Sequence, residues 1–116
     1  MPARDEMWID DMLQACRDAA AFISGRSRSD LDSDRQLELA LAKVVEIIGE
    51  AAANLSDVTR NSMSEVPWSD IIRMRNRLIH AYFHIDRNVL WDAATIHIPS
   101  LQNILVTRVR IVPDHE

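Results

Sequence analysis

Apolar residues recur every three or four positions along most of the chain, which is the pattern of amphipathic helices. The first such stripe lies within residues 5–24, and Gly25 directly after it predicts the end of a helix. A second stripe lies within residues 33–55, where Ser33 and Gln36 have the spacing of a capping box. Two long helices are therefore expected in the first half of the chain.

The second half of the chain predicts two further helices. Pro67 suits the first turn of a third helix that reaches Tyr82 or Phe83, because the N–H that proline lacks is not needed there. Asp86 is a favourable N-cap for a fourth helix, which Pro99 should kink or split because proline removes one helical hydrogen bond. Short connections favour antiparallel neighbours. The expected fold is an all-α antiparallel four-helix bundle, with its last helix kinked or split at Pro99.

Length and composition fit a single domain. The chain has 116 residues, of which 47% are hydrophobic. We expect the domain to span residues 1–112 and residues 113–116 to form a flexible tail. The acidic first turn does not resemble a leader peptide, and no segment offers the roughly 20 apolar residues of a membrane span. These observations predict a cytoplasmic protein without a membrane partner.

Charge is distributed unevenly between the two halves. The formal net charge of −5 argues against strong general attraction to nucleic acid. Residues 1–66 carry 7 basic and 13 acidic side chains, whereas residues 67–116 carry 6 basic and 5 acidic ones. Four arginines and two histidines crowd into one short segment: Arg73, Arg75, Arg77, His80, His84 and Arg87. A phosphate site is therefore expected on or near the third predicted helix.

Arg75 is the unusual member of this segment. On an ideal helix it falls in the middle of the apolar arc of residues 68–83, whereas Arg73 and Arg77 fall on the opposite arc. A guanidinium keeps its charge, so burying it without a partner is costly. The guanidinium of Arg75 therefore needs contact with solvent in a crevice, a phosphate ligand or a carboxylate partner. A purely structural ion pair with Glu50 of the second helix is an open alternative.

His80 adds a group that can transfer protons near neutral pH. Together with an arginine that holds phosphoryl oxygens, it suggests cleavage of RNA, whose own 2′-hydroxyl is the nucleophile. An ideal helix places positions 75 and 80 about 140° apart, so convergence needs a distortion near residues 79–83 or a second subunit. His80 and His84 also have a spacing open to two metal ligands, but no third ligand is evident, and no metal is expected.

The segment from Val66 to Asp86 resembles the signature of HepT-like HEPN toxins, whose motif is Arg-x-x-x-x-His-x-Tyr. The residues that carry the resemblance are Arg75, Asn76, His80 and Tyr82, together with Ile48-Gly49-Glu50-Ala51 in the second predicted helix. The resemblance extends from the first helix to about Leu105.

This resemblance implies a HEPN-like bundle that acts as the toxin of a type VII toxin–antitoxin system. Such toxins are homodimeric, metal-independent endoribonucleases whose two motifs line a cleft between subunits. Arg75 and His80 would be the catalytic pair, supported by Asn76 and Glu50. The expected product carries a 2′,3′-cyclic phosphate, because the ribose hydroxyl attacks the neighbouring phosphate.

The resemblance also implies a partner. The toxins of this family are usually paired with a minimal nucleotidyltransferase antitoxin, which transfers AMP from ATP to the motif tyrosine, here Tyr82. ATP would belong to the antitoxin, so no cofactor is expected for this chain. Arg73 and Arg77 are candidates for contacts with RNA.

Two other functions are compatible with the sequence. The bundle could be a non-catalytic nucleotide- or substrate-binding partner of a minimal nucleotidyltransferase, or a helical scaffold in which Arg75 makes a structural ion pair. The scaffold explains the bundle but not the crowded motif.

Overall fold

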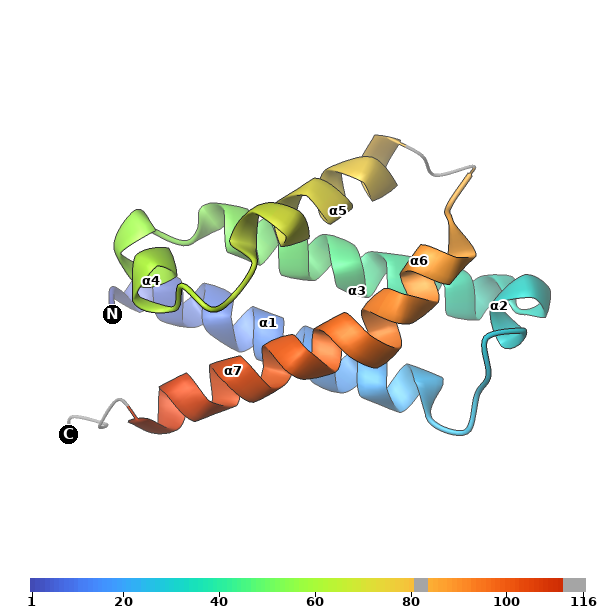
Figure 1. The fold of residues 1–116 in the computed structure, drawn as a ribbon, viewed down its shortest axis with the longest axis horizontal. Coiled ribbons are helices and arrows are strands. Elements are labelled where there is room, and N and C mark those ends of the chain that lie inside the picture. The colour runs from blue at the N-terminus through green and yellow to red at the C-terminus, as the bar shows by residue number, and fades with distance from the viewer. Residues whose placement is uncertain (81–83, 112–116) are drawn as a thin grey trace.

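The computed structural model describes residues 1–80 and 84–111, and the elements within them are helices. The long segments run side by side, and each one runs opposite to the one before it (Figure 1). They are α1 (Ala3–Ile23), α3 (Arg35–Asn54), α5 (Trp68–His80) and a last segment made of α6 (Arg87–Asp92), the π-helical turn η1 (Ala93–His97) and α7 (Ile98–Ile111). The short helices α2 (Asp30–Ser33) and α4 (Asp57–Ser62) lie in the connections. The predicted all-α antiparallel four-helix bundle is confirmed.

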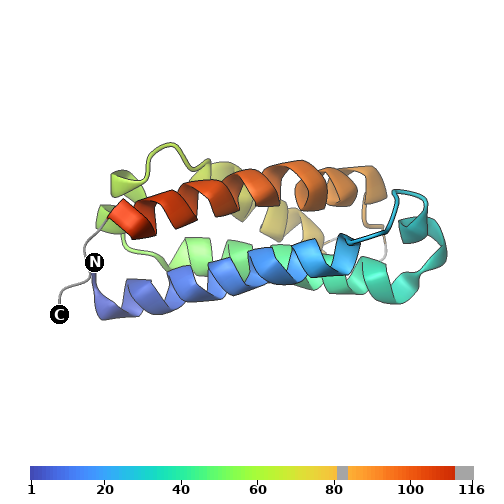
Figure 2. The same cartoon turned by 90° about the horizontal axis from the view of Figure 1, so that it is seen from below.

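The core lies between α1, α3 and the last segment. Figure 2 shows α1 and α7 side by side along their lengths, and the two helices contact each other. The largest fully buried side chains are Met12, Cys16, Leu31, Leu41, Leu90 and Leu105. Burial raises the pKa of the Cys16 thiol to about 11, so this cysteine is a packing residue. By contrast, α5 lies at the edge of the bundle and packs mainly on α3.

The cap of α3 differs from the prediction. Asp34, not Ser33, is the N-cap, and its carboxylate accepts a hydrogen bond from the N–H of Leu37 at 3.0 Å. Ser33 is the last residue of α2. An N-cap needs a non-helical backbone, which Asp34 has and Ser33 does not. The predicted capping box of Ser33 and Gln36 is therefore wrong.

Other boundaries agree with the sequence. Gly25 follows α1 with a φ of 72°, the left-handed conformation that glycine adopts easily. Asp86 caps α6 by accepting from the N–H groups of Asn88 and Val89. The last helix is split at η1, just before Pro99, where the N–H of Ile98 donates to the carbonyl of Ala93. Pro99 thus falls in the first turn of α7, where its missing N–H costs little.

Two buried carboxylates tie the connections to the bundle. Asp5 accepts hydrogen bonds from the N–H and hydroxyl of Ser56 and from the hydroxyl of Thr59, at the start of α4. Glu38 accepts from Arg87 Nε at 2.9 Å and also pairs with Arg35. These contacts fix where α4 and α6 begin. The Glu38–Arg87 contact thus holds the start of α6, which is where the connection from the end of α5 arrives.

Some predictions fall on other parts of the chain. The predicted end of the third helix at Tyr82 or Phe83 and the predicted tail lie outside the described residues. Within the described ranges, no helix combines the length and the apolar character needed to cross a membrane.

Candidate active site

The helix that carries the motif arginine, α5, is anchored at its start. The indole Nε1 of Trp68 donates to the carbonyl oxygens of Arg60 and Met63, both at 3.1 Å. Leu78 is buried nearer the other end, and the part-buried residues that pack on the core include Ile71, Ile72 and Met74. The apolar arc of α5 therefore faces the bundle. Arg75 lies in the middle of this arc, as predicted.

Gly49 allows α5 to approach α3 closely at this point. A Cβ built on Gly49 would lie 2.2 Å from the Cβ and 2.6 Å from the Cγ of Arg75. Carbon atoms in contact are normally about 3.5–4.0 Å apart, so any side chain at position 49 would push the helices away from each other. Gly49 therefore forms a seat that sets the position of Arg75.

The guanidinium of Arg75 is held by Glu50, the residue next to this seat. Nη1 of Arg75 donates to Oε1 of Glu50 at 2.6 Å. The side chain of Arg75 is 16% exposed and that of Glu50 is 54% exposed. Asn54, one turn further along α3, donates to the other oxygen of Glu50 at 3.3 Å. The ion pair that the sequence left open is thus formed.

This ion pair leaves Arg75 incompletely satisfied. Its Nε is buried and has no hydrogen-bond partner in the part of the chain that the structure describes. The strongest arginine–carboxylate pairs are bidentate, with two parallel hydrogen bonds, whereas this one uses Nη1 alone. Arg75 is thus a largely covered cation, and its only carboxylate partner among the described residues, Glu50, is half-exposed.

Three further polar side chains of α5 lie on its outer side. Arg73, Asn76 and Arg77 are exposed, and Arg73 pairs with Asp70 at 2.9 Å. This placement fits a solvated face as well as a surface for RNA. The expectation that Asn76 supports catalysis and that Arg73 and Arg77 contact RNA therefore stays a prediction.

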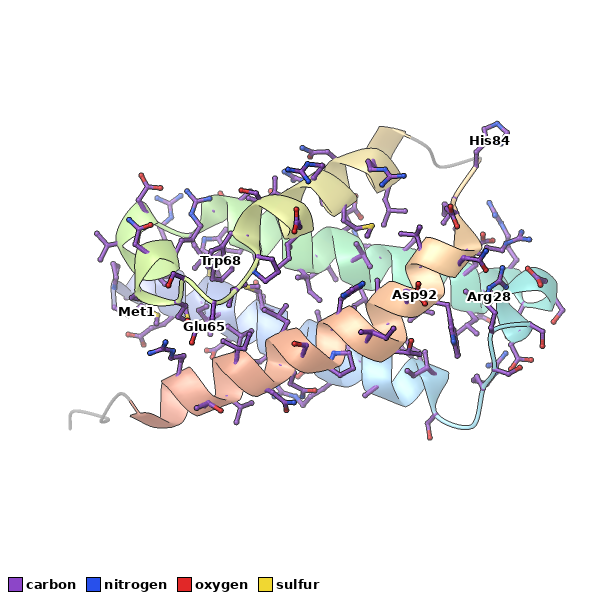
Figure 3. The ribbon with its side chains drawn as sticks, in the orientation of Figure 1. Met1, Arg28, Glu65, Trp68, His84 and Asp92 are labelled. Atoms are coloured by element: carbon purple, nitrogen blue, oxygen red, sulfur yellow. The ribbon has the colours of Figure 1, made fainter. Side chains whose placement is uncertain are left out.

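The remaining motif residues are only partly placed. His80 is the last residue of α5, but its side chain lies outside the described part of the chain, as does all of Tyr82. Since α5 is α-helical through position 80, no distortion before that point reduces the angle of about 140° from position 75. His84 is exposed and points away from the bundle at the opposite end of α5 from Trp68 (Figure 3).

The sequence did not reveal a groove of about 500 Å³ beside α5. Its walls come from α5 and from η1 and α7, and its floor comes from α3. The apolar lining includes Val45, Ile48, Ile71, Met74, Leu101 and Ile104, and polar groups at the groove include Asp70, His97 and Ser100. The position of His97 at this groove could not be predicted from the sequence, because the lining of a groove depends on how separate helices are spaced.

No group of three or more His, Cys, Asp or Glu side chains that could hold a metal ion occurs among the residues the structure describes. The expectation that this chain needs no cofactor stays a prediction.

Comparisons with known proteins agree on one family. The sequence profile of the family described as "Ribonuclease HepT-like" matches residues 12–107. The chain is 36% identical over 95 residues to "Putative RNase TTE0752" of Caldanaerobacter subterraneus, an alignment that covers 82% of this chain and 85% of the relative. It is 35% identical over 95 residues to "Probable ribonuclease HepT" of Thermococcus cleftensis, covering 82% and 86% of the two chains. No solved structure matches.

Proposed function

Because the chain belongs to the HepT-like ribonuclease family, we propose that it is a metal-independent endoribonuclease that acts as the toxin of a type VII toxin–antitoxin system in the cytoplasm. The observation that carries this proposal is the placement of Arg75. A residue that always carries charge is seated against a glycine in the apolar face of α5, and its Nε has no hydrogen-bond partner among the described residues. The pair with Glu50 does not explain this unpaired donor, whereas binding of a phosphate does.

In the proposed reaction, Arg75 stabilises the negative charge that develops on the phosphate during attack by the ribose 2′-hydroxyl. His80 takes the proton from the attacking 2′-hydroxyl, and a proton is delivered to the departing 5′-oxygen. The O2′–P bond forms, the P–O5′ bond breaks, and the product ends in a 2′,3′-cyclic phosphate. Asn76 would support this pair, and Arg73 and Arg77 would contact the RNA backbone.

The geometry of α5 supports a homodimer as the active form. Five residues of regular helix separate positions 75 and 80 by about 140° around the axis and about 7.5 Å along it. A single regular α5 therefore carries the two positions on different sides of its axis. A second subunit related by two-fold symmetry supplies the missing group, so the cleft lies between two copies.

Regulation would act through Tyr82, as the family resemblance implies. A minimal nucleotidyltransferase antitoxin would transfer AMP from ATP to its hydroxyl. The added phosphate would place negative charge close to the motif, where it would compete with RNA for Arg75.

The test is cleavage of RNA by the purified protein and by single variants. We expect Arg75→Ala and His80→Ala each to reduce cleavage about a hundredfold while the circular dichroism of the helices is unchanged. His84→Ala is the matched control, since it removes the neighbouring histidine, and it should change cleavage little. Cleavage should persist in chelator.

The Arg75–Glu50 pair on its own also suits the scaffold or a non-catalytic binding partner. The cleavage assay distinguishes a ribonuclease from a scaffold or a non-catalytic binding partner. Undiminished cleavage by folded Arg75→Ala would refute the site. A complete lack of cleavage by the wild-type protein, combined with tight binding to a nucleotidyltransferase, would favour the non-catalytic partner.

A further inference from the structure

We propose that Glu50 is a built-in competitor of the RNA phosphate: its carboxylate occupies Nη1 of Arg75 in the free protein and is displaced when RNA binds. This inference rests on the proposed function, because it takes Arg75 as the phosphate ligand. It replaces the catalytic support that the resemblance implies for Glu50 with a different role, in which Glu50 sets the affinity for RNA.

The contact is built into the fold. Gly49 seats the first side-chain carbons of Arg75 against α3, with no room for a Cβ between them. The carboxylate that meets the guanidinium belongs to the very next residue. Most surface ion pairs join two long, freely rotating side chains. Here one partner is 84% covered and fixed at its root, so the pair forms whenever Glu50 turns inward.

The same contact can be broken without disturbing the core. Glu50 is 54% exposed, and its other side-chain partner among the described residues is Asn54 on the same helix. Rotation of the Glu50 side chain into solvent would therefore cost only this single ion pair and the contact with Asn54. Arg75, by contrast, keeps its place against Gly49.

A phosphodiester would satisfy Arg75 better than Glu50 does. The carboxylate engages only Nη1 and leaves Nε without a partner among the described residues. A phosphate carries its charge on two non-bridging oxygens and can accept parallel hydrogen bonds from one guanidinium. The phosphate and the carboxylate are both negative, so they repel each other if both remain at Arg75. Binding of RNA therefore favours displacement of the Glu50 carboxylate from Arg75.

Glu50→Gln removes the charge and keeps an amide oxygen that can accept from Nη1. At a separation of about 5 Å, in surroundings between bulk water and protein surface, removing this repulsion should tighten RNA binding by roughly three- to tenfold. The matched control is Glu46→Gln, because Glu46 lies one turn earlier on α3 and pairs with Lys43 at 3.0 Å. This control removes the same charge from the same helix and should change affinity less than about twofold.

The probe is a fluorescent 2′-O-methyl RNA oligonucleotide, which lacks the attacking hydroxyl, and binding to the full-length protein is followed by anisotropy. Arg75→Ala should weaken binding, and adding Glu50→Gln to Arg75→Ala should bring no further gain. Unchanged or weaker binding by Glu50→Gln overturns the proposal. So does an equal gain in Glu46→Gln, or a gain that persists without Arg75, because either would indicate a general charge effect.

The outcome is independent of catalysis. Cleavage of ordinary RNA by the wild-type protein is measured in parallel. If the wild-type protein binds the probe through Arg75 but cleaves no RNA, the ribonuclease function fails while the competition is still decided by the binding data. If the protein cleaves RNA but Glu50→Gln binds no more tightly, only the role of Glu50 fails.

Discussion

Substitution of Gly49 by alanine should separate folding from activity. The new Cβ would start 2.2 Å from the Cβ of Arg75, and it needs about 3.5 Å or more. Since the nearest atoms are the first side-chain carbons of Arg75, no distant rotation of that side chain relieves the clash. Helices α3 and α5 must move apart by about 1.3 Å at this point.

The cost in stability should be modest. Overpacking of this kind costs about 1–3 kcal/mol, while alanine in the middle of a helix is about 1 kcal/mol better than glycine. The free energy of unfolding should therefore fall by about 0–2 kcal/mol, which corresponds to a Tm lower by at most about 10 °C. The variant remains folded at room temperature.

The cost in activity should be much larger. A displacement of about 1 Å at a catalytic group can reduce the rate about a hundredfold, because the bound geometry is no longer productive. We therefore expect cleavage by Gly49→Ala to fall about a hundredfold, measured with a short RNA at 25 °C, below the unfolding transition found by circular dichroism.

The matched control is the only other glycine of the chain. Gly25→Ala places an L residue at a φ of 72°, which costs about 1 kcal/mol, but apart from its chain neighbours its Cβ meets no atom of the described residues within 4 Å. This variant should lose stability and keep its cleavage rate. Near wild-type cleavage by folded Gly49→Ala would refute the role of the seat. A similar loss in both variants would show that activity follows stability instead.

Two further predictions concern stability and regulation. Asp5→Asn should lower the free energy of unfolding by about 1–3 kcal/mol, since it weakens the hydrogen bonds at the start of α4. Those bonds, first the one from the Ser56 hydroxyl, hold the pKa of Asp5 below its ordinary value, so its stabilising effect is complete above about pH 4 and is lost as the pH falls through the lowered pKa. Urea unfolding at a series of pH values should show a flatter decline for Asp5→Asn in that acidic range, and an identical slope would contradict this reasoning. Tyr82→Phe should still cleave RNA but should gain no AMP from the cognate nucleotidyltransferase and ATP, as peptide mass spectrometry would reveal, whereas AMP on another residue would refute the acceptor.

Periodicity within one helix was sufficient to predict where Arg75 lies. The apolar arc of α5 had to face the bundle, and a permanent charge inside that arc needed a partner. Glu50 is one of the partners that the sequence leaves open, and the structure forms that pair. The end of α1 at Gly25 and the cap of α6 at Asp86 were likewise predictable, because each depends on a few adjacent residues.

Features that depend on the spacing between helices were not predictable. Gly49 belongs to the family pattern in the second predicted helix, but its contact with Arg75 is a property of two helices together. The groove beside α5 has the same origin. The predicted capping box is wrong because Ser33 and Asp34 are both favourable N-cap residues. The choice between them depends on the short helix α2, which the polar sequence before residue 33 does not predict.

Whether the active site combines residues from two subunits can be decided with mixed dimers. Because α5 is regular through position 80, one chain keeps Arg75 and His80 on different sides of the same helix. If each site joins Arg75 of one protomer to His80 of its partner, a dimer of one Arg75→Ala chain and one His80→Ala chain contains one complete site and one that lacks both groups.

Random mixing should then restore about a quarter of wild-type cleavage, because about half of the dimers are mixed and each has one working site. Co-expression with two different tags and purification through both should raise this to about half. Recovery requires both variants, so a dimer that carries Arg75→Ala in both chains under the two tags is the control. If purified mixed dimers stay as inactive as that control, Arg75 and His80 do not combine across the subunit interface, and the shared cleft is refuted.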